Sequence, residues 1–307
     1  MAQALQYFKA MADDTRLRLF CMLSRYELNV NELILILGMG QSRVSRHLKI
    51  LASSGLVKWR RDGLWVFYSA VQEGEVRQFT DAVLPFVLRD ALFQRDIAAA
   101  AAIIEDRLSA TRQFFNAIAD DWDQLAQEVL GSYDLPGAIA AIVPAGAVAV
   151  DLGCGTGEVM ERMLPAASGL IGVDGSARML ERAKRRFAEE GTPVSLRIGD
   201  LEHLPLRDGE ADFISINMVL HHLSIPEAAL VEAQRVLRPK GCLVITDFDS
   251  HDNESMRVTY GDRWLGFTYA FLCAALEKAG FVLVAATKVP VEKGLFIHFI
   301  QAESAAS

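Results

Sequence analysis

The apolar residues of this chain follow two patterns. Up to about residue 115 they recur at helical spacing around one pair of short strands, whereas from residue 147 short apolar runs alternate with helical stretches. The second pattern predicts a mainly parallel sheet with helices on both faces. Its seven expected strands are 147–152, 170–174, 194–198, 211–216, 242–247, 281–287 and 295–301, and its clear helices are 178–190 and 226–237. We therefore expect an α+β domain followed by a doubly wound, Rossmann-like α/β domain.

The N-terminal part of the chain predicts three helices and a hairpin. The expected helices cover 8–23, 32–37 and 41–51, and the expected strands cover 55–60 and 64–68, around a turn at 61–63. In the third helix Val44, Leu48 and Leu51 share one face, which predicts its buried side. Helix, glycine turn, basic helix and hairpin together form the winged helix-turn-helix pattern.

The polar face of the third helix and the hairpin tip suit a polyanion. The whole chain holds 31 Lys and Arg against 39 Asp and Glu, but residues 1–70 hold ten against five. This imbalance indicates that only the first module meets a polyanion, although a solvated basic helix is the alternative. Hydroxyls and arginines at a helix start suit base edges and phosphates in a major groove. The candidate DNA-contact residues are Gln41, Ser42, Arg43, Ser45, Arg46, Lys49, Arg60 and Arg61.

The segment 75–115 is expected to be helical, with a break at Pro85. Apolar Phe79, Val83 and Phe86 favour a helix that pairs with a second copy of the chain, and a long helical connector follows it. A plain spacer helix is the alternative. The expected domains are then 1–85 and 111–307, joined by the connector 86–110.

Two asparagines interrupt the apolar run YELNVNELILILG at 26–38. Asparagine competes for nearby backbone groups, so it favours helix caps over helix interiors. Because Asn31 directly precedes Glu32, we expect Asn31 to be the N-cap of the second helix.

Four successive strands of the second domain end in residues that suit a nucleoside. The first ends in VDLGCGTGE, whose glycines permit a tight turn and close approach of a ligand to the backbone. Glu158 stands where a dinucleotide site would have glycine, and its charge opposes a pyrophosphate. Asp174, Asp200 and Asn217 follow the next three strands, and Asp174 is placed to accept from ribose hydroxyls. Together these strand ends predict a nucleoside-type ligand.

Composition and cysteine spacing narrow the class of protein further. The longest apolar runs, 97–104 and 138–150, are shorter than the roughly 18 residues that span a bilayer. The four cysteines lie far apart, which indicates neither a disulfide framework nor a zinc site. We expect a cytoplasmic protein with no membrane partner and no metal.

Residues 3–85 resemble an ArsR-type winged helix. The resemblance rests on MADDTRLRLF, ELNVNEL, SRVSRHLKILASSGLV and the wing RRDGLWVFYS. It implies binding of operator DNA as a homodimer, through this domain and its helix. Family members bind a metal through the cysteines of an ELCVCDL motif, where this chain has Asn29 and Asn31. Amides do not bind soft metals as thiolates do, so metal sensing is not carried over.

Residues 111–307 are similar to class I S-adenosylmethionine-dependent methyltransferases, with a first segment like that of ubiquinone/menaquinone methyltransferases. VDLGCGTG, GVDGSARML, GDLEHLPL and INMVLHHL carry this resemblance. It implies S-adenosylmethionine as cofactor, S-adenosylhomocysteine as product and a small-molecule methyl acceptor. The implied cofactor residues are Asp151, Gly153, Cys154, Gly155, Gly157, Asp174, Gly175, Ser176, Met179, Gly199, Asp200, Leu201, Asn217 and Met218.

The residues expected around a methyl acceptor are Phe115, Trp122, His251 and Trp264. His221 is the candidate catalytic base, which is needed only if the acceptor must lose a proton. The segment 247–267 either builds an acceptor site or is a structured surface loop. Two functions stay open: a methyltransferase whose first domain couples expression to substrate or cofactor, and a non-catalytic regulator that senses S-adenosylmethionine or S-adenosylhomocysteine.

Overall fold

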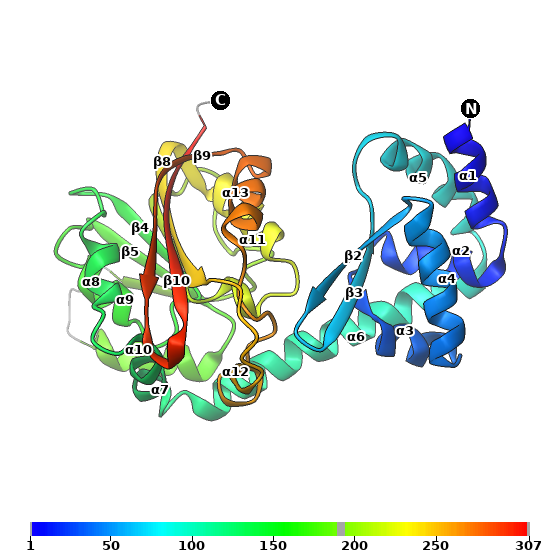
Figure 1. The fold of residues 1–307 in the computed structure, drawn as a ribbon. Coiled ribbons are helices and arrows are strands. Elements are labelled where there is room, and N and C mark those ends of the chain that lie inside the picture. The colour runs from blue at the N-terminus through cyan, green and yellow to red at the C-terminus, as the bar shows by residue number, and fades with distance from the viewer. Residues whose placement is uncertain (1, 189–193, 306–307) are drawn as a thin grey trace. The chain divides into compact units, whose positions relative to one another are not determined.

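The computed structural model describes residues 2–188 and 194–305, and the chain divides into two compact units, 1–107 and 108–307 (Figure 1). The described elements that begin in the first unit are α1 (Ala2–Met11), α2 (Asp14–Leu23), β1 (Leu28–Asn29), α3 (Val30–Leu37), α4 (Gln41–Ser53), β2 (Val57–Asp62), β3 (Trp65–Ala70), α5 (Gly74–Val87) and α6 (Ala91–Ile118). The helix α6 continues into the second unit.

The first expected helix is two helices: α1 ends at Met11, and α2 begins at Asp14 after the N-cap residue Asp13. Asp13 has an extended backbone, and its side chain accepts a hydrogen bond from the Arg16 amide at 3.0 Å as the N-cap of α2. The expected buried face of α4 is confirmed, since Val44, Leu48 and Leu51 are fully buried.

Asn29, not Asn31, is the N-cap of α3, so that expectation was wrong. The Oδ1 atom of Asn29 accepts from the amides of Asn31 at 2.9 Å and Glu32 at 3.1 Å. The Glu32 carboxylate in turn accepts from the Asn29 amide at 2.8 Å, which completes a capping box. The helix therefore begins two residues earlier than expected, at Val30.

The hairpin and the later helices also differ in detail from expectation. Strands β2 and β3 pair up to Asp62 opposite Trp65, so the turn consists of Gly63 and Leu64, with Gly63 at φ +57°. Pro85 lies inside the last turn of α5, and the break falls three residues later at Leu88. A proline ring disturbs the helical turn before it, which explains why the helix continues briefly beyond Pro85.

Seven described strands form the sheet of the second unit in the order β6-β5-β4-β7-β8-β10-β9. Strands β4 to β8 pair in parallel, whereas β10 runs antiparallel to β8 and β9. The chain adds β5 and β6 on one side of β4 and then β7 on the other, which places the switch point of strand order between β4 and β7. These strands are β4 (Val148–Leu152), β5 (Gly169–Asp174), β6 (Val194–Ile198), β7 (Ala211–Asn217), β8 (Leu237–Phe248), β9 (Phe281–Pro290) and β10 (Phe296–Ser304).

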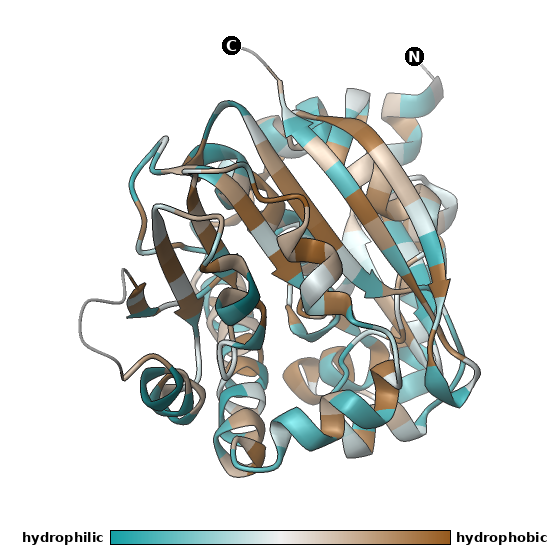
Figure 2. Cartoon of the chain, turned by 90° about the vertical axis from the view of Figure 1, so that its left-hand side faces the viewer, coloured by the Kyte–Doolittle hydropathy of each residue, from teal (hydrophilic) through white to brown (hydrophobic). Residues whose placement is uncertain are grey.

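Helices cover both faces of this sheet. The buried side chains of α11 and α13 form one core against it, and those of α8 and α9 form a second core on the other face. Figure 2 shows the central strands mainly in the hydrophobic colour, as expected for strands covered on both faces. The helices are α7 (Trp122–Leu130), α8 (Leu135–Ala140), α9 (Glu158–Met163), α10 (Ala177–Arg186), η1 (Leu220–His222), α11 (Pro226–Val236), α12 (Ser255–Thr259), α13 (Tyr269–Lys278) and η2 (Glu292–Gly294).

The helix expected over 178–190 ends at Arg186 as α10, and positions 189 and 190 lie outside the described residues. Within the described parts of the chain, every helix is too short or too polar to cross a membrane.

Candidate functional site

A cavity of about 390 Å³ lies at the carboxyl ends of β4, β5, β6 and β7. This is the size of many small-molecule sites, and the position is the one that ligands take in open α/β sheets. Of the residues predicted to hold the cofactor, all except Gly157 line it. Gly157 instead shapes the turn: its φ is +86°, and a Cβ there would lie 2.7 Å from the Phe187 ring.

The glycine loop after β4 lets a ligand approach the backbone. Gly153 has a φ of +74°, and a Cβ on it would lie 2.4 Å from Val219 Cγ2. Gly155 also has a positive φ of +51°, but the atom nearest to its added Cβ is Trp122 Nε1 at 3.7 Å. Gly153 is therefore required for packing, whereas Gly155 leaves its side of the loop open toward the cavity.

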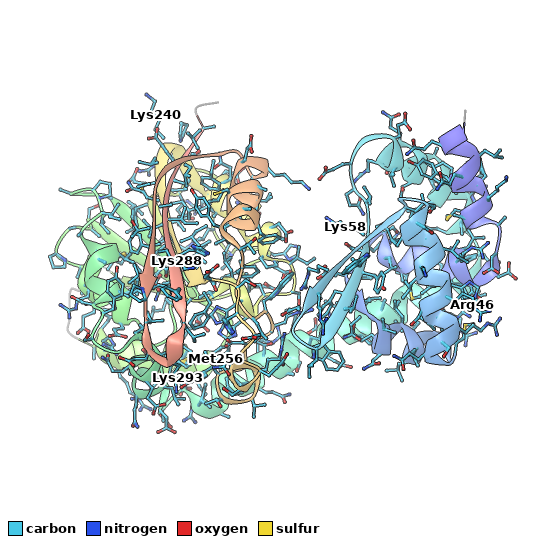
Figure 3. All side chains as sticks on the ribbon, viewed as in Figure 1. Arg46, Lys58, Lys240, Met256, Lys288 and Lys293 are labelled. Atoms are coloured by element: carbon cyan, nitrogen blue, oxygen red, sulfur yellow. The ribbon has the colours of Figure 1, made fainter. Side chains whose placement is uncertain are left out.

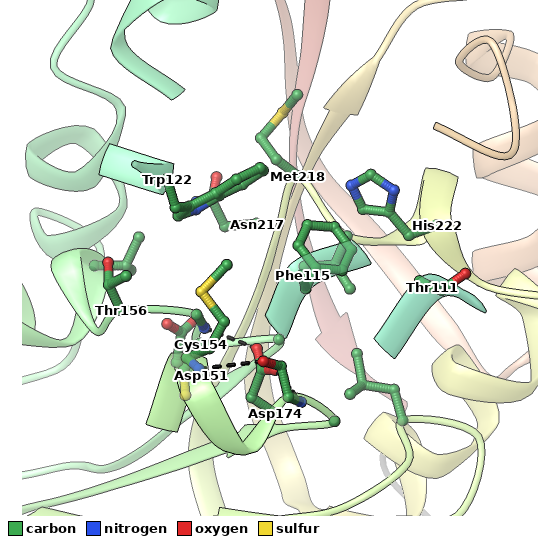
Figure 4. Close-up of a pocket in the computed structure, with 18 of the residues that line it drawn as sticks. Thr111, Phe115, Trp122, Asp151, Cys154, Thr156, Asp174, Asn217, Met218 and His222 are labelled. Atoms are coloured by element: carbon green, nitrogen blue, oxygen red, sulfur yellow. Dashed lines mark hydrogen bonds between the residues drawn. The ribbon is translucent and has the colours of Figure 1, made fainter. Parts of the chain in front are cut away.

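Asp174 holds this loop to the next one. Its two carboxylate oxygens accept from the amides of Gly155 at 2.9 Å and Ser176 at 2.7 Å (Figure 4). Burial raises the pKa of Asp174, and these two amides act in the opposite direction. Each oxygen keeps a second lone pair, so the carboxylate can still accept hydrogen bonds from a ligand.

Asp151 is more deeply buried than Asp174. Its Oδ1 atom accepts from the Ser215 hydroxyl at 2.6 Å. Burial raises its pKa to about 7; the Ser215 hydrogen bond lowers it and the neighbouring Asp174 raises it further. Two carboxyl groups whose pKa is raised by burial thus stand at the base of the cavity.

The end of α6 and the start of α7 form the opposite wall, where Figure 4 shows Phe115 and Trp122 across from Asp151 and Asp174. The rings of Phe115 and Trp122 meet edge to face at 5.3 Å. Hydrogen bonds fix this wall to the loops below: Ser176 donates to Asn116 at 2.7 Å. A further ion pair of 2.7 Å joins Arg186 to Asp123 beside the glycine loop.

Sequence reasoning missed the part of α6 that lines the cavity. Leu108, Thr111 and Arg112 line it together with the predicted Phe115. Their spacing of three and four residues places them on one face of the helix, and this pattern was the available signal. The expected connector ended at 110, and among the cavity-lining residues of this helix only Phe115 was predicted.

After β7 the backbone is strained at the cavity wall. Met218 has a φ of +53°, which is uncommon for a residue with a side chain. The Asn217 Oδ1 atom accepts from the Thr246 hydroxyl at 2.6 Å, so the amide group of Asn217 is held in one orientation. Figure 4 shows both side chains at the cavity.

Of the two adjacent histidines, His222 lines the larger cavity, whereas the candidate base His221 lies outside its lining. His221 is buried behind it, with Nδ1 2.8 Å from Asp247 Oδ1. Burial lowers the pKa of His221, but Asp247 and Asp262 overcome this effect and raise it. Burial and the neighbouring His221 hold the pKa of His222 well below its usual range.

Two residues expected around an acceptor lie elsewhere. Trp264 is buried in the core against Phe267, and its indole N–H donates to the Leu223 carbonyl at 2.8 Å. A tryptophan whose indole N–H is bonded in this way contributes packing, and Trp264 does not line the larger cavity. His251 packs against Phe248 with ring centroids 5.6 Å apart and is not part of the cavity lining.

In the first unit α4 presents the expected polar face. Gln41, Ser42, Arg43, Ser45, Arg46 and Lys49 are all exposed, and Figure 3 shows Arg46 pointing outward. Arg61 is also exposed. Arg60 differs, because its guanidinium contacts Glu27 at 2.6 Å and Asp62 at 3.2 Å and lies over the Phe67 ring. These contacts neutralise Arg60, so it does not belong with the exposed cations.

Comparison with known proteins finds a matching family for a segment of each unit. Residues 13–58 match the family described as bacterial regulatory proteins of the arsR family, and residues 150–245 match a methyltransferase domain. The chain thus joins a domain of the arsR-regulator type to a domain of the methyltransferase type.

The individual relatives each match part of the chain. An uncharacterized 37.1 kDa protein in transposon TN4556 of Streptomyces fradiae is 37% identical over 58% of this chain and 52% of its own length. The arsenic resistance transcriptional regulator ArsR1 of Pseudomonas putida is 43% identical over 26% of this chain and 62% of its own. The ubiquinone/menaquinone biosynthesis C-methyltransferase UbiE of Desulfotalea psychrophila is 30% identical over 44% of this chain and 56% of its own length. The chain therefore spans little more than half of each relative.

Among solved structures, the cyclase SpnF superposes with a TM-score of 0.55 at 18% identity, over 64% of this chain and 95% of its own. This similarity shows the fold alone, since one fold hosts many reactions.

Proposed function

We propose that the second unit binds S-adenosylmethionine in the larger cavity and transfers its methyl group to a small molecule, while the first unit binds operator DNA. One observation carries this proposal: Asp174, Asp200 and Asn217 converge with the glycine loop around one cavity. These groups come from four adjacent strand ends, and their chemistry matches the separate parts of a nucleoside amino acid.

The residues present fit this cofactor. The free lone pairs of Asp174 suit the ribose hydroxyls, and Gly175, Ser176 and Met179 would border the base. Asp200 and Leu201 would read its amine and ring, while Asp151 and Asn217 would face the methionine part. When bound, the cofactor supplies a methyl group on a positively charged sulfur.

The chain would promote transfer by positioning and by excluding water. Methyl transfer is a displacement in line, so a fixed approach of the acceptor supplies much of the rate. The edge-to-face wall of Phe115 and Trp122 would cover the reacting end, and the hydrogen bond from Ser176 to Asn116 would hold the wall in place. Relatives of the UbiE type support a small acceptor.

The first unit would act as a cytoplasmic homodimer on double-stranded DNA, with the exposed residues of α4 in the major groove. Exposed apolar side chains on α1 and α5, namely Leu5, Phe8 and Phe86, support pairing with a second copy of the chain. The role of Asn29 as the N-cap of α3 supports the view that this unit has no thiolate metal sensor of its own.

A second candidate is a regulator that senses the cofactor without turnover. The helix α6 favours it, because Phe93 and Ile97 of this helix are buried in the first unit and Thr111 and Phe115 line the cavity of the second. One continuous helix could therefore couple ligand binding to DNA affinity, provided that the ligand binds the two DNA-affinity states differently.

Calorimetry of S-adenosylmethionine and S-adenosylhomocysteine, with and without a duplex selected by this protein from a random library, tests the proposal. We expect one site per chain, and release of S-adenosylhomocysteine from a metabolite library would support the enzyme. Binding that changes duplex affinity at fixed salt without any release would favour the sensor. If neither cofactor form binds, the proposal fails.

A further inference from the structure

Beside the larger cavity lies a buried cluster of two histidines and one aspartate, to which the proposed function assigns no role; of the three, His222 also lines that cavity. His221 and His222 belong to η1, and Asp262 follows α12. All three side chains are more than nine-tenths buried. One ligand atom of each lies within 4.8 Å of those of the other two.

Both imidazoles are oriented through Nδ1. His222 Nδ1 lies 3.1 Å from the Gly261 carbonyl, which can only accept, so this nitrogen carries the proton. His221 Nδ1 lies 2.8 Å from Asp247 Oδ1 and donates in the same way to a carboxylate. When both rings are neutral, each Nε2 therefore carries a lone pair.

The atoms that meet at the centre of this cluster are hydrogen-bond acceptors that receive no hydrogen bond from the described residues. His222 Nε2 and both carboxylate oxygens of Asp262 are buried and have no hydrogen-bond partner within the described residues. Asp262 Oδ1 lies 3.6 Å from His221 Nε2, which is longer than a hydrogen bond. Buried acceptors that face one another are costly unless a hydrogen-bond donor or a cation lies between them.

We propose that His221, His222 and Asp262 bind one divalent transition-metal ion of the Zn²⁺ class. Two imidazoles and one carboxylate are a common ligand set for such ions, and three protein ligands leave a coordination position open. The ring orientation agrees, because metal-binding histidines usually donate their other nitrogen to a carboxylate or a backbone carbonyl. Asp247 and the Gly261 carbonyl provide these two partners.

The open position would face an acceptor. A smaller cavity of about 40 Å³ is lined by all three proposed ligands together with Phe248 and Tyr260. It shares five lining residues with the larger cavity, namely Trp122, Ala126, Leu130, Met218 and His222. An anionic or hydroxyl oxygen bound to the metal would therefore stand beside the end of the cavity proposed for the acceptor.

A proton is the competing occupant. An imidazolium at His221 between Asp247 and Asp262 would account for the ion-pair distances of 2.8 and 3.6 Å. It would not provide a donor for His222 Nε2. The two occupants differ in an experiment, because only one of them depends on added metal.

The test uses the tag-free full-length protein, stripped with a chelator and titrated with Zn²⁺ against a chromophoric competitor, in the absence of S-adenosylmethionine. We expect one tight equivalent, lost in Asp262→Asn and in His222→Gln. Asp247→Asn, which removes only the partner of a ligand, should weaken binding roughly 10–100-fold. His298→Gln is the matched control: His298 is equally buried beside Asp249 at 3.0 Å but lies outside the cluster, and this variant should bind as the wild type does.

Cobalt distinguishes this site from the cysteines, because thiolate ligands add a charge-transfer band that imidazole and carboxylate do not. We expect the Co²⁺-loaded protein to show visible absorption bands but no thiolate charge-transfer band. Far-ultraviolet circular dichroism should show that the variants fold. If Asp262→Asn is unfolded, His222→Gln alone decides. Wild-type affinity no tighter than that of the folded ligand variants, or a spectrum dominated by thiolate, would overturn the proposal. Because no cofactor is present, its failure leaves the proposed function standing.

Discussion

The polar face of α4 and the larger cavity are both rich in polar groups, but their surroundings are opposite. The side chains of Arg43 and Arg46 are exposed and form no ion pair with the described residues. The carboxylates of Asp151 and Asp174 are held by specific donors before any ligand arrives. The first arrangement suits a long polyanion whose binding depends on salt, and the second suits one ligand of fixed shape.

Removing the carboxylate of Asp174 should give the largest effect. Asp174→Ala removes an acceptor for two ligand hydroxyls, each worth about 1.5–3 kcal/mol to a charged group, so we expect cofactor affinity to fall more than about 100-fold. Basal DNA affinity should stay within about twofold, measured by calorimetry and by fluorescence anisotropy. Undiminished cofactor affinity would show that the ribose assignment is wrong.

Replacing a glycine by alanine should cost more unfolding free energy at the larger cavity than in the first unit. Gly153→Ala adds a clash with Val219 to a left-handed backbone, and we expect a loss of about 2–5 kcal/mol in unfolding free energy. Gly38→Ala, at φ +64° with nothing near its added Cβ, should cost only about 1–2 kcal/mol. Denaturant titrations compare them, and equal losses would contradict the packing role of Gly153.

Asp151 should make stability depend on pH. Folded Asp151 keeps its proton up to about pH 7, whereas the unfolded carboxyl releases it near its ordinary value of 3.8. Its contribution to stability is thus complete at low pH and is lost as pH rises toward 7. Asp151→Asn lacks this loss, so its stability relative to wild type should rise by about 1–3 kcal/mol between pH 4 and pH 7 and then level off. Parallel melting temperatures across this range would refute the assignment.

The exposed arginines should follow the rules of phosphate contact. Arg46→Ala should weaken DNA binding about tenfold and reduce the slope of log affinity against log salt by about one. Arg60→Ala should leave that slope unchanged and lower the melting temperature instead, because Arg60 pairs with Glu27 and Asp62. A reduced salt dependence of DNA binding in Arg60→Ala would show instead that Arg60 contacts DNA.

The smallest effect should separate the two asparagines. Asn29→Ala removes the capping box and should cost about 1 kcal/mol of unfolding free energy, whereas Asn31→Ala should cost less than about 0.5 kcal/mol. Thermal unfolding of the two variants, in the same buffer, measures the difference. Equal costs would contradict the cap at Asn29.

Local periodicity predicted the elements well, because the strands and α4 have strong apolar patterns. It also placed the strand-end residues of the cavity, since carboxyl ends of parallel strands meet at one edge. It could not tell His222 from His221, because the tight turn of η1 decides which ring faces the cavity. Nor could it place Trp264 and Arg60, whose partners Leu223 and Glu27 are about 40 and 33 residues away in sequence. Asn31 was mistaken for the cap because helix starts are among the least certain boundaries.

The capping box of α3 also sets what a single substitution at position 29 can do. The Asn29 side chain supports the first turn of a helix that packs into the core through Leu33 and Leu37. In the ELCVCDL motif of the family that this segment resembles, cysteines stand at the positions of Asn29 and Asn31. A thiol is a weak hydrogen-bond acceptor, so a cysteine at position 29 would weaken the first turn of α3. A thiolate site built here would therefore have to offset the loss of the helix cap.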